Sequence, residues 1–311
     1  MDSELSAPPG KARRRRGQCA ATHAPDNSAR PAHRDGYKRP VPEGHTIHRL
    51  AGRHRELFAG RAVTVSSPQG RFADGARRVD GRVLLDTSAH GKHLLHHYEG
   101  DVTLHVHLGL YGKFTDGEGD APPPVGEVRL RMANPAHWLD LRGPTACELL
   151  DPLQVEALHA RLGPDPLAEE DDGGVGAFTA IKRSDRPLMA LLMDQSVVAG
   201  AGLIYVTEAL FRAGLRPTVP GRRLTRRRWD AIWQDLRVLM RSGVADGRID
   251  TVRDLHTPEA MGRAPRVDRH GGEVYVYRRA GLPCLVCGTP VRTAELSARN
   301  AYWCPVCQAT R

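Results

Sequence analysis

The stretch "PCLVCGTPVRTAELSARNAYWCPVCQ", residues 283–308, contains four of the six cysteines of this 311-residue chain. Their spacing is C-x2-C-x16-C-x2-C, and they are Cys284, Cys287, Cys304 and Cys307. Each C-x2-C pair can offer two thiolates on one tight turn, and four thiolates suit a closed tetrahedral zinc site. The stretch therefore predicts one structural Zn2+ that takes the place of a hydrophobic core.

The segment between the two cysteine pairs is expected to form a hairpin that the metal holds. Its sequence, "VRTAELSARNAY" at residues 291–302, exposes Arg292 and Arg299. Guanidinium groups bind phosphate through charge-assisted hydrogen bonds, so the hairpin is suited to nucleic acid. Zinc ribbons also mediate protein contacts, and this stretch by itself leaves both kinds of partner open.

Helical periodicity characterises the region before the cysteines. The strings "RPLMALLMDQ" (186–195), "IYVTEALFRAG" (204–214) and "RRWDAIWQDLRVLMRSG" (227–243) follow "LGPDPL" at residues 162–167. They predict an all-helical domain. The next segment, residues 246–272, has many charges, Gly and Pro and little periodicity, and is predicted to be a linker or mobile loop.

Two glycines, Gly200 and Gly202, separate two of these helical runs in "DQSVVAGAGLIYVTEAL", residues 194–210. Closely spaced glycines allow a tight turn whose backbone N–H groups point to one place beside a helix N-terminus, which is a way to bind phosphate. A short helical turn without any function would also use glycine here. The spacing alone therefore leaves both interpretations open.

The N-terminal half is expected to be an antiparallel β-sandwich that follows a helix of about four turns from Glu43 to Gly60. Along residues 102–110, apolar residues alternate with Thr103, His105, His107 and Gly109, which is the period of a half-buried strand. The strand signals are "RAVTVSS" (61–67), "GRVLLDTSAHGKHLLHHY" (81–98), "VTLHVHLGLYGKF" (102–114) and "EVRLRMA" (127–133).

Charge and composition limit the class of protein. The net charge is +9, but residues 1–40 contain nine Lys/Arg against four Asp/Glu and no apolar periodicity, so this segment is expected to be disordered. No run of eighteen apolar residues occurs, which argues against a membrane protein. Cys19 and Cys147 are isolated, and this fits a reducing cytoplasm.

These signals predict an α+β multidomain fold. We expect residues 1–41 to be a disordered or mis-annotated extension and residues 42–160 a β-sandwich domain opened by a helix. Residues 161–271 would form the helical domain, and residues 272–311 the zinc-finger domain.

Several motifs in one order resemble the formamidopyrimidine-DNA glycosylase and endonuclease VIII family of base-excision repair enzymes. The resemblance runs from residue 42 to about residue 308. It implies a β-sandwich, a helix-two-turn-helix domain and a zinc finger, with double-stranded DNA carrying oxidised bases or abasic sites as the partner of a nucleoid-associated monomer. The motifs are "PEGHTIHR" (42–49), "GKHLL" (91–95), "LGLYGKF" (108–114), "DLRGP" (140–144), "LLMDQSVVAGAGLIYVTEALFRAG" (191–214) and "ARNAYWCPVCQ" (298–308).

The resemblance also implies a set of catalytic residues. Pro42 would be the nucleophile, whose secondary amine attacks the anomeric carbon, and Glu43 the acid/base that helps to open the sugar. Lys92 would contact phosphate and transfer a proton in β-elimination, while Arg299 would assist δ-elimination and hold phosphate. Glu208 matches a pocket carboxylate. A neutral α-amine is a competent nucleophile because its pKa is roughly 7.7 to 8.0.

Leu110 and Tyr111 match the residues that this family inserts into the space left by a flipped base. Without the resemblance, Leu110 would be the last core residue of a strand and Tyr111 a sheet-edge aromatic, while Pro42 and Glu43 would be an ordinary helix start. Six histidines of the N-terminal half are interpreted as surface or DNA-facing groups: His45, His48, His96, His97, His105 and His107.

Two positions depart from the family pattern. Leu203 stands where the family has an asparagine that bonds a DNA phosphate, and the loss of such a bond weakens binding by about 1.5 to 3 kcal/mol. Pro42 is internal, so its nitrogen is a tertiary amide that cannot form a Schiff base. We expect translation to begin at Val41, from a GTG codon read as methionine, and removal of that methionine to expose the amine.

The sequence thus predicts a bifunctional DNA glycosylase and abasic-site lyase. "PEGHTIHR" and the short "LGLYG" resemble the endonuclease VIII branch, which acts on oxidised pyrimidines, more than the purine-specific branch. A glycosylase specific for 8-oxoguanine and formamidopyrimidine is the alternative. A non-catalytic protein that binds damaged DNA is the alternative if Pro42 is not N-terminal.

Overall fold

The computed structural model of the chain describes residues 42–267 and 272–309, all of which fall within one compact unit, residues 39–311. The expectations for the basic N-terminal segment and for Val41 concern residues outside the described ones. Among the described helices, none combines the length and the apolar character that a membrane span requires.

Helix α1 (Gly44–Phe58) confirms the helix expected at the start of the domain. Ile47, Ala51, His54 and Phe58 are buried at spacings of three or four residues, so they form one face of the helix. The backbone is extended at Ala59, where the helix ends. This buried face positions α1 against the strands that follow.

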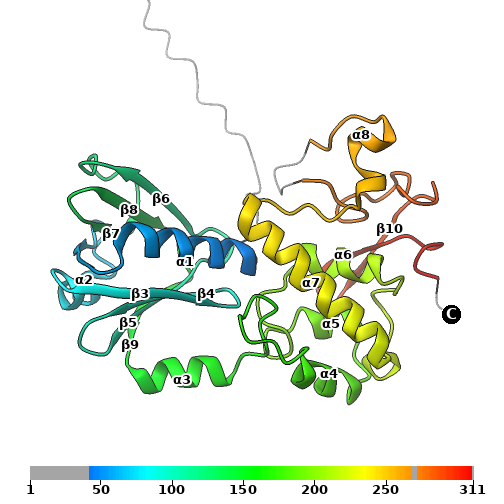
Figure 1. Ribbon diagram of the computed structural model, residues 1–311, viewed down its shortest axis with the longest axis horizontal. Coiled ribbons are helices and arrows are strands. Elements are labelled where there is room, and N and C mark those ends of the chain that lie inside the picture. The colour runs from blue at the N-terminus through cyan, green and yellow to red at the C-terminus, as the bar shows by residue number, and fades with distance from the viewer. Residues whose placement is uncertain (1–41, 268–271, 310–311) are drawn as a thin grey trace, which may run out of the picture. The chain divides into compact units, whose positions relative to one another are not determined.

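Two antiparallel sheets face each other, with α1 between them (Figure 1). The sandwich expected from the strand pattern is therefore confirmed. One sheet has the order β1 (Arg61–Ala62), β3 (Val83–His90), β4 (His93–Tyr98), β5 (Val102–His107) and β9 (Ala146–Leu150). The other has the order β2 (Thr64–Ser66), β7 (Val128–Ala133), β8 (His137–Arg142) and β6 (Lys113–Glu118).

The core of the sandwich is made by leucines of both sheets and by the buried face of α1. Leu94 and Leu104 from one sheet and Leu130 and Leu139 from the other are completely buried, in one cluster with Ile47. Each such side chain contributes about 1.5 to 3 kcal/mol of hydrophobic stabilisation. Helix α2 (Ala73–Val79) closes part of the same core through its own buried residues.

The strand expected to run to residue 110 is shorter in the structure. Strand β5 ends at His107, and Gly109 has a φ of 64°, so the chain turns there. Thr103 and His105, expected on a solvated face, are buried because β9 pairs with β5 and helix α3 (Pro152–Ala160) packs against both. Side chains of β5 alternate between the two faces of the sheet as expected, but tertiary contacts decide what covers each face.

The interpretation of the histidines as surface or DNA-facing groups is wrong for three of them. His45, His96 and His105 are at most 6 % exposed. Imidazoles can occupy such positions because neutral rings hydrogen-bond to one another, as His54 Nδ1 and His96 Nε2 do at 3.0 Å in the sandwich core.

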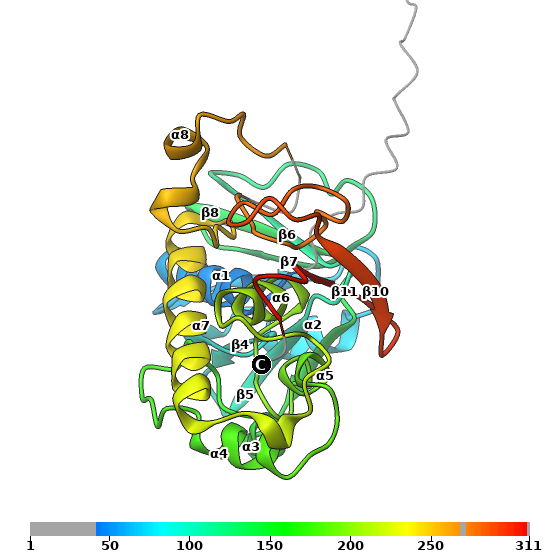
Figure 2. The same ribbon diagram turned by 90° about the vertical axis from the view of Figure 1, so that its right-hand side faces the viewer.

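The second core combines the helices with the C-terminal hairpin. Trp229 and Trp233 are buried in one cluster with Tyr275, Ala301 and Cys304. Figure 2 shows α6 between α7 and the hairpin, which confirms the hairpin expected between the cysteine pairs. The elements are α4 (Val175–Lys182), α5 (Leu188–Leu192), α6 (Leu203–Arg212), η1 (Gly221–Arg223), α7 (Arg226–Asp246), β10 (Arg292–Leu296) and β11 (Arg299–Trp303).

The expected linker at residues 246–272 is more ordered than its composition indicates. Its described part contains η2 (Asp254–His256) and α8 (Pro258–Met261). Glu273 accepts hydrogen bonds from Arg263 Nη2 and from the backbone N of Arg266. The charged residues of this segment indicated a linker because their hydrogen-bond partner, Glu273, lies outside it in the sequence.

The buried imidazole pair should make the fold sensitive to acid. Burial lowers the pKa of His54 to about 3 and the pKa of His96 well below its usual value, so both rings stay neutral in the folded protein. Unfolded histidines bind protons below about pH 6.5, so the unfolded state gains protons that the folded state cannot take. Stability should fall by up to about 1.4 kcal/mol per pH unit for each ring below that pH.

Thermal unfolding followed by circular dichroism at several pH values measures this dependence. The double variant His54→Leu/His96→Leu should show a flatter decline of Tm between neutral and acidic pH than the unaltered chain. The explanation is wrong if both proteins lose stability in parallel.

Candidate active site and DNA interface

Glu43 occupies the N-cap position of α1, but its carboxylate binds the N-terminus of α6. Oε2 accepts from the backbone N of Gly202 at 3.0 Å, and Oε1 accepts from the N of Ile204 at 2.9 Å. The N of Tyr205 also donates to Oε2, at 3.4 Å. The carboxylate thus satisfies first-turn N–H groups at the positive end of a helix 161 residues away along the chain.

The glycine turn allows this close approach. A Cβ atom at Gly202 would lie 2.4 Å from Cδ of Glu43, and the backbone N of Gly44 donates to the O of Gly200 at 2.8 Å. The N–H of Gly202 is therefore occupied by Glu43, and the N–H of Gly200 donates to Oε1 of Gln195 at 3.0 Å. These two groups are used within the protein, which favours the structural interpretation of the glycine turn over direct binding of phosphate by Gly200 and Gly202.

The turn that carries Lys92 is held on the other side of the same glycine turn. Lys92 lies between β3 and β4, and the preceding Gly91 donates its backbone N–H to Oδ2 of Asp165 at 2.7 Å. The same carboxylate oxygen lies 2.8 Å from Nε2 of His48 on α1. A Cβ at Gly91 would come within 3.0 Å of Ala199 Cβ, so only glycine allows this packing.

A cavity of about 420 Å3 brings together four of the five predicted catalytic residues: Pro42, Glu43, Lys92 and Arg299. Burial raises the pKa of Glu43, against the charge of Lys92 and the N–H donors of α6. Burial lowers the pKa of Lys92, against the charge of Glu43, and Arg299 adds to the lowering. Opposite shifts of an acid and a base in one cavity are what proton transfer near neutral pH requires.

The predicted wedge residues lie at the edge of this cavity. Leu110 is 56 % exposed and lines it, and Tyr111 beside it is 76 % exposed. Both residues lie in the turn after β5. Large apolar side chains at such exposure are available to a partner, because the core beneath them does not use them.

The hairpin presents its two arginines differently. Arg299 follows the Ser297–Ala298 turn and lines both the main cavity and a smaller one of about 220 Å3 with Arg186. Arg292 is exposed at the opposite end of the hairpin, where it pairs with Trp303. Only the first of the two lies beside the other predicted catalytic residues.

Glu208 is the predicted catalytic residue that the structure places elsewhere. Its side chain is completely buried and is not among the residues that line the cavity. Its carboxylate accepts from the backbone N of Tyr275, Val276 and Tyr277 and from Oγ1 of Thr251. Glu208 therefore positions the chain before the zinc finger, because the oxygens of a buried carboxyl group must have hydrogen-bond partners.

Leu203 lines the cavity as the first residue of α6. Sequence reasoning missed other lining residues, although Gln195 stood in a motif already noted. Tyr277 and Arg278 gave no signal, because they reach the cavity only after the second core has assembled. His107, predicted to be a surface or DNA-facing group, lines the cavity too, and so do Ile47, Met193, Gln195, Tyr277 and Arg278.

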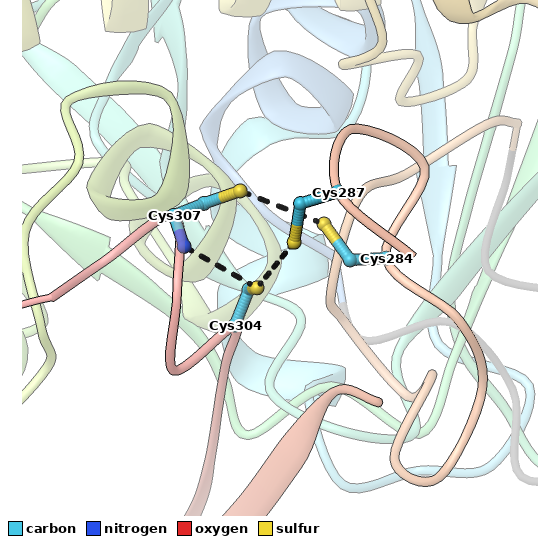
Figure 3. A group of neighbouring side chains, drawn as sticks. All are labelled: Cys284, Cys287, Cys304 and Cys307. Atoms are coloured by element: carbon cyan, nitrogen blue, oxygen red, sulfur yellow. Dashed lines mark hydrogen bonds between the residues drawn. The ribbon is translucent and has the colours of Figure 1, made fainter. Parts of the chain in front are cut away.

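The four cysteines form one cluster, as Figure 3 shows. The Sγ atoms of Cys284 and Cys307 are 3.8 Å apart, and those of Cys287 and Cys304 are 3.4 Å apart. A tetrahedral zinc with Zn–S bonds of about 2.3 Å requires sulfur atoms about 3.8 Å apart. The donor set and its spacing therefore fit Zn2+ and leave it without an open position for a substrate.

Comparison with protein families agrees with this arrangement. The formamidopyrimidine-DNA glycosylase N-terminal domain matches residues 41–147, and the formamidopyrimidine-DNA glycosylase H2TH domain matches residues 162–254. A zinc finger found in FPG and IleRS matches residues 281–310. The three matches follow the order of the sandwich, the helices and the cysteine cluster.

Matches to individual proteins extend over nearly the whole length of those proteins. "Endonuclease 8 1" of Mycobacterium tuberculosis is 51% identical over 275 residues, covering 86% of this chain and 100% of the relative. "Formamidopyrimidine-DNA glycosylase" of Thermus thermophilus is 34% identical, covering 86% and 97%.

Solved structures share the fold. Lactococcus lactis Fpg, in a complex with DNA containing an abasic site, has a TM-score of 0.70 at 22% identity, covering 86% of this chain and 100% of that one. MutM (Fpg) from Thermus thermophilus has a TM-score of 0.66 at 29% identity, covering 86% and 98%.

Removal of zinc should disorder the hairpin, because Cys304 and Tyr302 belong to the second core. We expect one zinc ion per chain. A chelator that removes it should change the fluorescence of Trp303 on β11 and abolish DNA binding. Metal analysis of Cys287→Ser should find almost no zinc. The matched control Cys147→Ser alters a thiol on β9 and should keep its metal; equal zinc in both variants would refute the four-thiolate site.

Proposed function

Because the chain belongs to the formamidopyrimidine-DNA glycosylase and endonuclease VIII family, and is thus a DNA glycosylase of base-excision repair, we propose that it is bifunctional. It would excise oxidised bases, pyrimidines in particular, from double-stranded DNA and then cleave the strand. The observation that supports this most is the convergence of Pro42, Glu43, Lys92 and Arg299 on one cavity.

Pro42 is the proposed nucleophile. Its free secondary amine adds to C1′ of the damaged nucleotide, the N-glycosidic bond breaks, and the base leaves with a proton. The iminium that remains acidifies the C2′ proton, so β-elimination and then δ-elimination can break the two C–O bonds to phosphate. Water finally hydrolyses the iminium and releases the sugar fragment, which restores the amine.

Glu43 is the proposed acid/base for opening the sugar ring. It directly follows Pro42, and its carboxylate is held by the N–H groups of Gly202 and Ile204, so its position relative to the amine is restricted. The raised pKa of this buried carboxyl favours a protonated form that can donate to the ring oxygen.

Lys92 and Arg299 are the proposed phosphate ligands. The lowered pKa of the half-buried Lys92 amine lets it accept the C2′ proton during β-elimination. Arg299 can bind phosphate through two N–H groups while it assists δ-elimination. Leu110 and Tyr111, exposed beside the cavity, would fill the space of the flipped nucleotide.

The preference for pyrimidines rests on the name of the relative that is 51% identical, an endonuclease 8. The relative named formamidopyrimidine-DNA glycosylase, at 34% identity, supports purine lesions as the alternative. Excision assays on duplexes that carry thymine glycol, dihydrouracil or 8-oxoguanine distinguish them. Faster excision of 8-oxoguanine than of both pyrimidines would refute the preference.

Schiff-base chemistry requires Pro42 to be N-terminal. We propose that the active form begins there, after initiation at Val41 and removal of the initiator methionine. An amide nitrogen has no available lone pair, so the chain with residues 1–41 attached should not be trapped on abasic-site DNA by borohydride. Protein produced from a methionine codon at position 41 should give a covalent adduct, with the modification on Pro42 by mass spectrometry.

Glu43→Gln in the shortened protein is the control for this experiment. A preformed abasic site already equilibrates with its open aldehyde, so trapping should persist, whereas excision of thymine glycol should fall by about 100-fold. An adduct on the chain with an acylated Pro42 would overturn the assignment of the nucleophile. DNA binding without trapping in the shortened protein would indicate a non-catalytic damage-binding protein.

Leu203 should limit the affinity for DNA. It lines the cavity at the start of α6, where an amide side chain could donate to a phosphate. Leu203→Asn should therefore tighten binding by about 1.5 to 3 kcal/mol, roughly tenfold or more in Kd. Titration with a duplex containing an uncleavable abasic analogue measures the change, and an unchanged Kd would show that other groups already bind that phosphate.

A further inference from the structure

The outer face of the five-stranded sheet carries imidazoles that the proposed chemistry does not use. Strands β4 and β5 place His93 opposite His107, and Ala146 and Glu148 of β9 lie opposite His107 and His105. Helix α3 packs against β5 and β9 (Figure 1). The histidines gathered on this face or over it are His90, His93, His97, His105, His107 and His159.

Three of these histidines form, together with Glu148, a connected series from solvent to the cavity. Oε1 of Glu148 lies 3.0 Å from Nδ1 of His105, and Nε2 of His105 lies 2.8 Å from Nδ1 of His93. The rings of His93 and His107 have centroids 4.9 Å apart. The Glu148 side chain is 55 % exposed, whereas His107 lines the cavity with Lys92 and Arg299. We call Glu148, His105, His93 and His107 the histidine chain.

The exposed carboxylate sets the tautomers of the buried His105 ring and the half-buried His93 ring. An ionised Glu148 can only accept, so Nδ1 of His105 must carry the proton and donate it. In a neutral ring Nε2 of His105 is then an acceptor, which requires Nδ1–H of His93 to donate. His93 is left with a lone pair on Nε2, in a ring that contacts His107.

His107 is held neutral by its surroundings. Burial lowers the pKa of His107, and the neighbouring His105, Lys92 and Arg161 lower it further. Burial also lowers the pKa of His93 to about 3, with contributions from His105, His107, Arg161 and His90. Burial lowers the pKa of His105 as well, but the hydrogen-bonded Glu148 carboxylate opposes that shift. Arg299 adds a further positive charge to the cavity that His107 lines.

We propose that the histidine chain couples DNA binding to proton uptake: when a DNA phosphate enters the cavity, His107 takes one proton from solvent, and Glu148 stabilises that charge through His105 and His93. This inference rests on the proposed function, because it takes DNA as the ligand. Glu148, His105 and His93 are then positioning residues, and His107 is the group that meets the phosphate. No bond of the DNA changes in this step.

The sign of the linkage follows from the charges. A bound phosphate raises the pKa of His107 above its value in the free protein, so the complex holds more protons than its separate parts. Affinity should therefore increase as the pH falls through the pKa of the complex. The increase ends at the lower pKa of the free protein.

The test measures binding of the protein that begins at Pro42, the proposed active form, to a duplex with a tetrahydrofuran abasic analogue, at constant ionic strength from about pH 5.5 to 8.5. The unaltered chain should bind more tightly towards low pH, by up to about tenfold per pH unit. Glu148→Gln should weaken binding near pH 6 by roughly three- to tenfold and leave it unchanged near pH 8.5. Glu99→Gln removes the same charge from an exposed turn of the same sheet and should follow the unaltered chain.

A second measurement needs no DNA. Nitrogen-15 NMR of the histidine rings should show His105 and His93 protonated on Nδ1 at neutral pH. Protonation of either ring on Nε2 would overturn the chain of donors.

Two binding outcomes separate this inference from the proposed function. If the unaltered chain binds abasic-site DNA but Glu148→Gln and Glu99→Gln have the same pH dependence, only the histidine chain is refuted. If the unaltered chain does not bind such DNA at any pH, the proposed function fails, and this inference fails with it.

Discussion

The hydrogen bonds from the N-terminus of α6 to the carboxylate of Glu43 hold the site together. They join the first helix of the sandwich to the helical region through the backbone N–H groups of Gly202 and Ile204. A buried carboxylate is costly unless its oxygens are satisfied, and a helix N-terminus offers unpaired donors together with a positive dipole. The carboxylate and the unpaired N–H groups each offset the desolvation cost of the other. The cavity lies where α1 and α6 meet.

This constraint also explains the glycines around the cavity. A Cβ atom would lie 2.4 Å from Glu43 at Gly202 and 3.0 Å from Ala199 at Gly91, whereas Gly200 has a φ of 83°, which favours glycine. Asp165 holds the turn that carries Lys92 against the same place. The buried Glu43 and the half-buried Lys92 consequently line one cavity, with pKa values shifted in opposite directions.

The sequence by itself determined the elements whose signals are local or strongly patterned. The cysteine spacing indicated a zinc hairpin, the periodicities indicated a helix, a sandwich and a helical region, and the motifs with Pro42, Glu43, Lys92 and Arg299 indicated one site. The structure confirms the fold and brings these four residues to one cavity. Such signals are readable because each depends on residues that are close in sequence or on a motif already complete in itself.

Only the tertiary structure decided the partner of each polar group. Glu208 was expected in the pocket but accepts from three backbone N–H groups 67 to 69 residues away along the chain. The N–H of Gly202, for which a phosphate partner was one of two interpretations, donates to Glu43. Thr103, His105 and His107 of β5 alternate with apolar residues like a solvated face, yet β9 pairs with β5 and α3 packs against both. Neutral imidazole rings fit there because each is donor and acceptor at once. The physical reason is the same in each case: a sequence specifies donors, acceptors and charges, whereas burial and pairing depend on segments that meet only when the chain has folded.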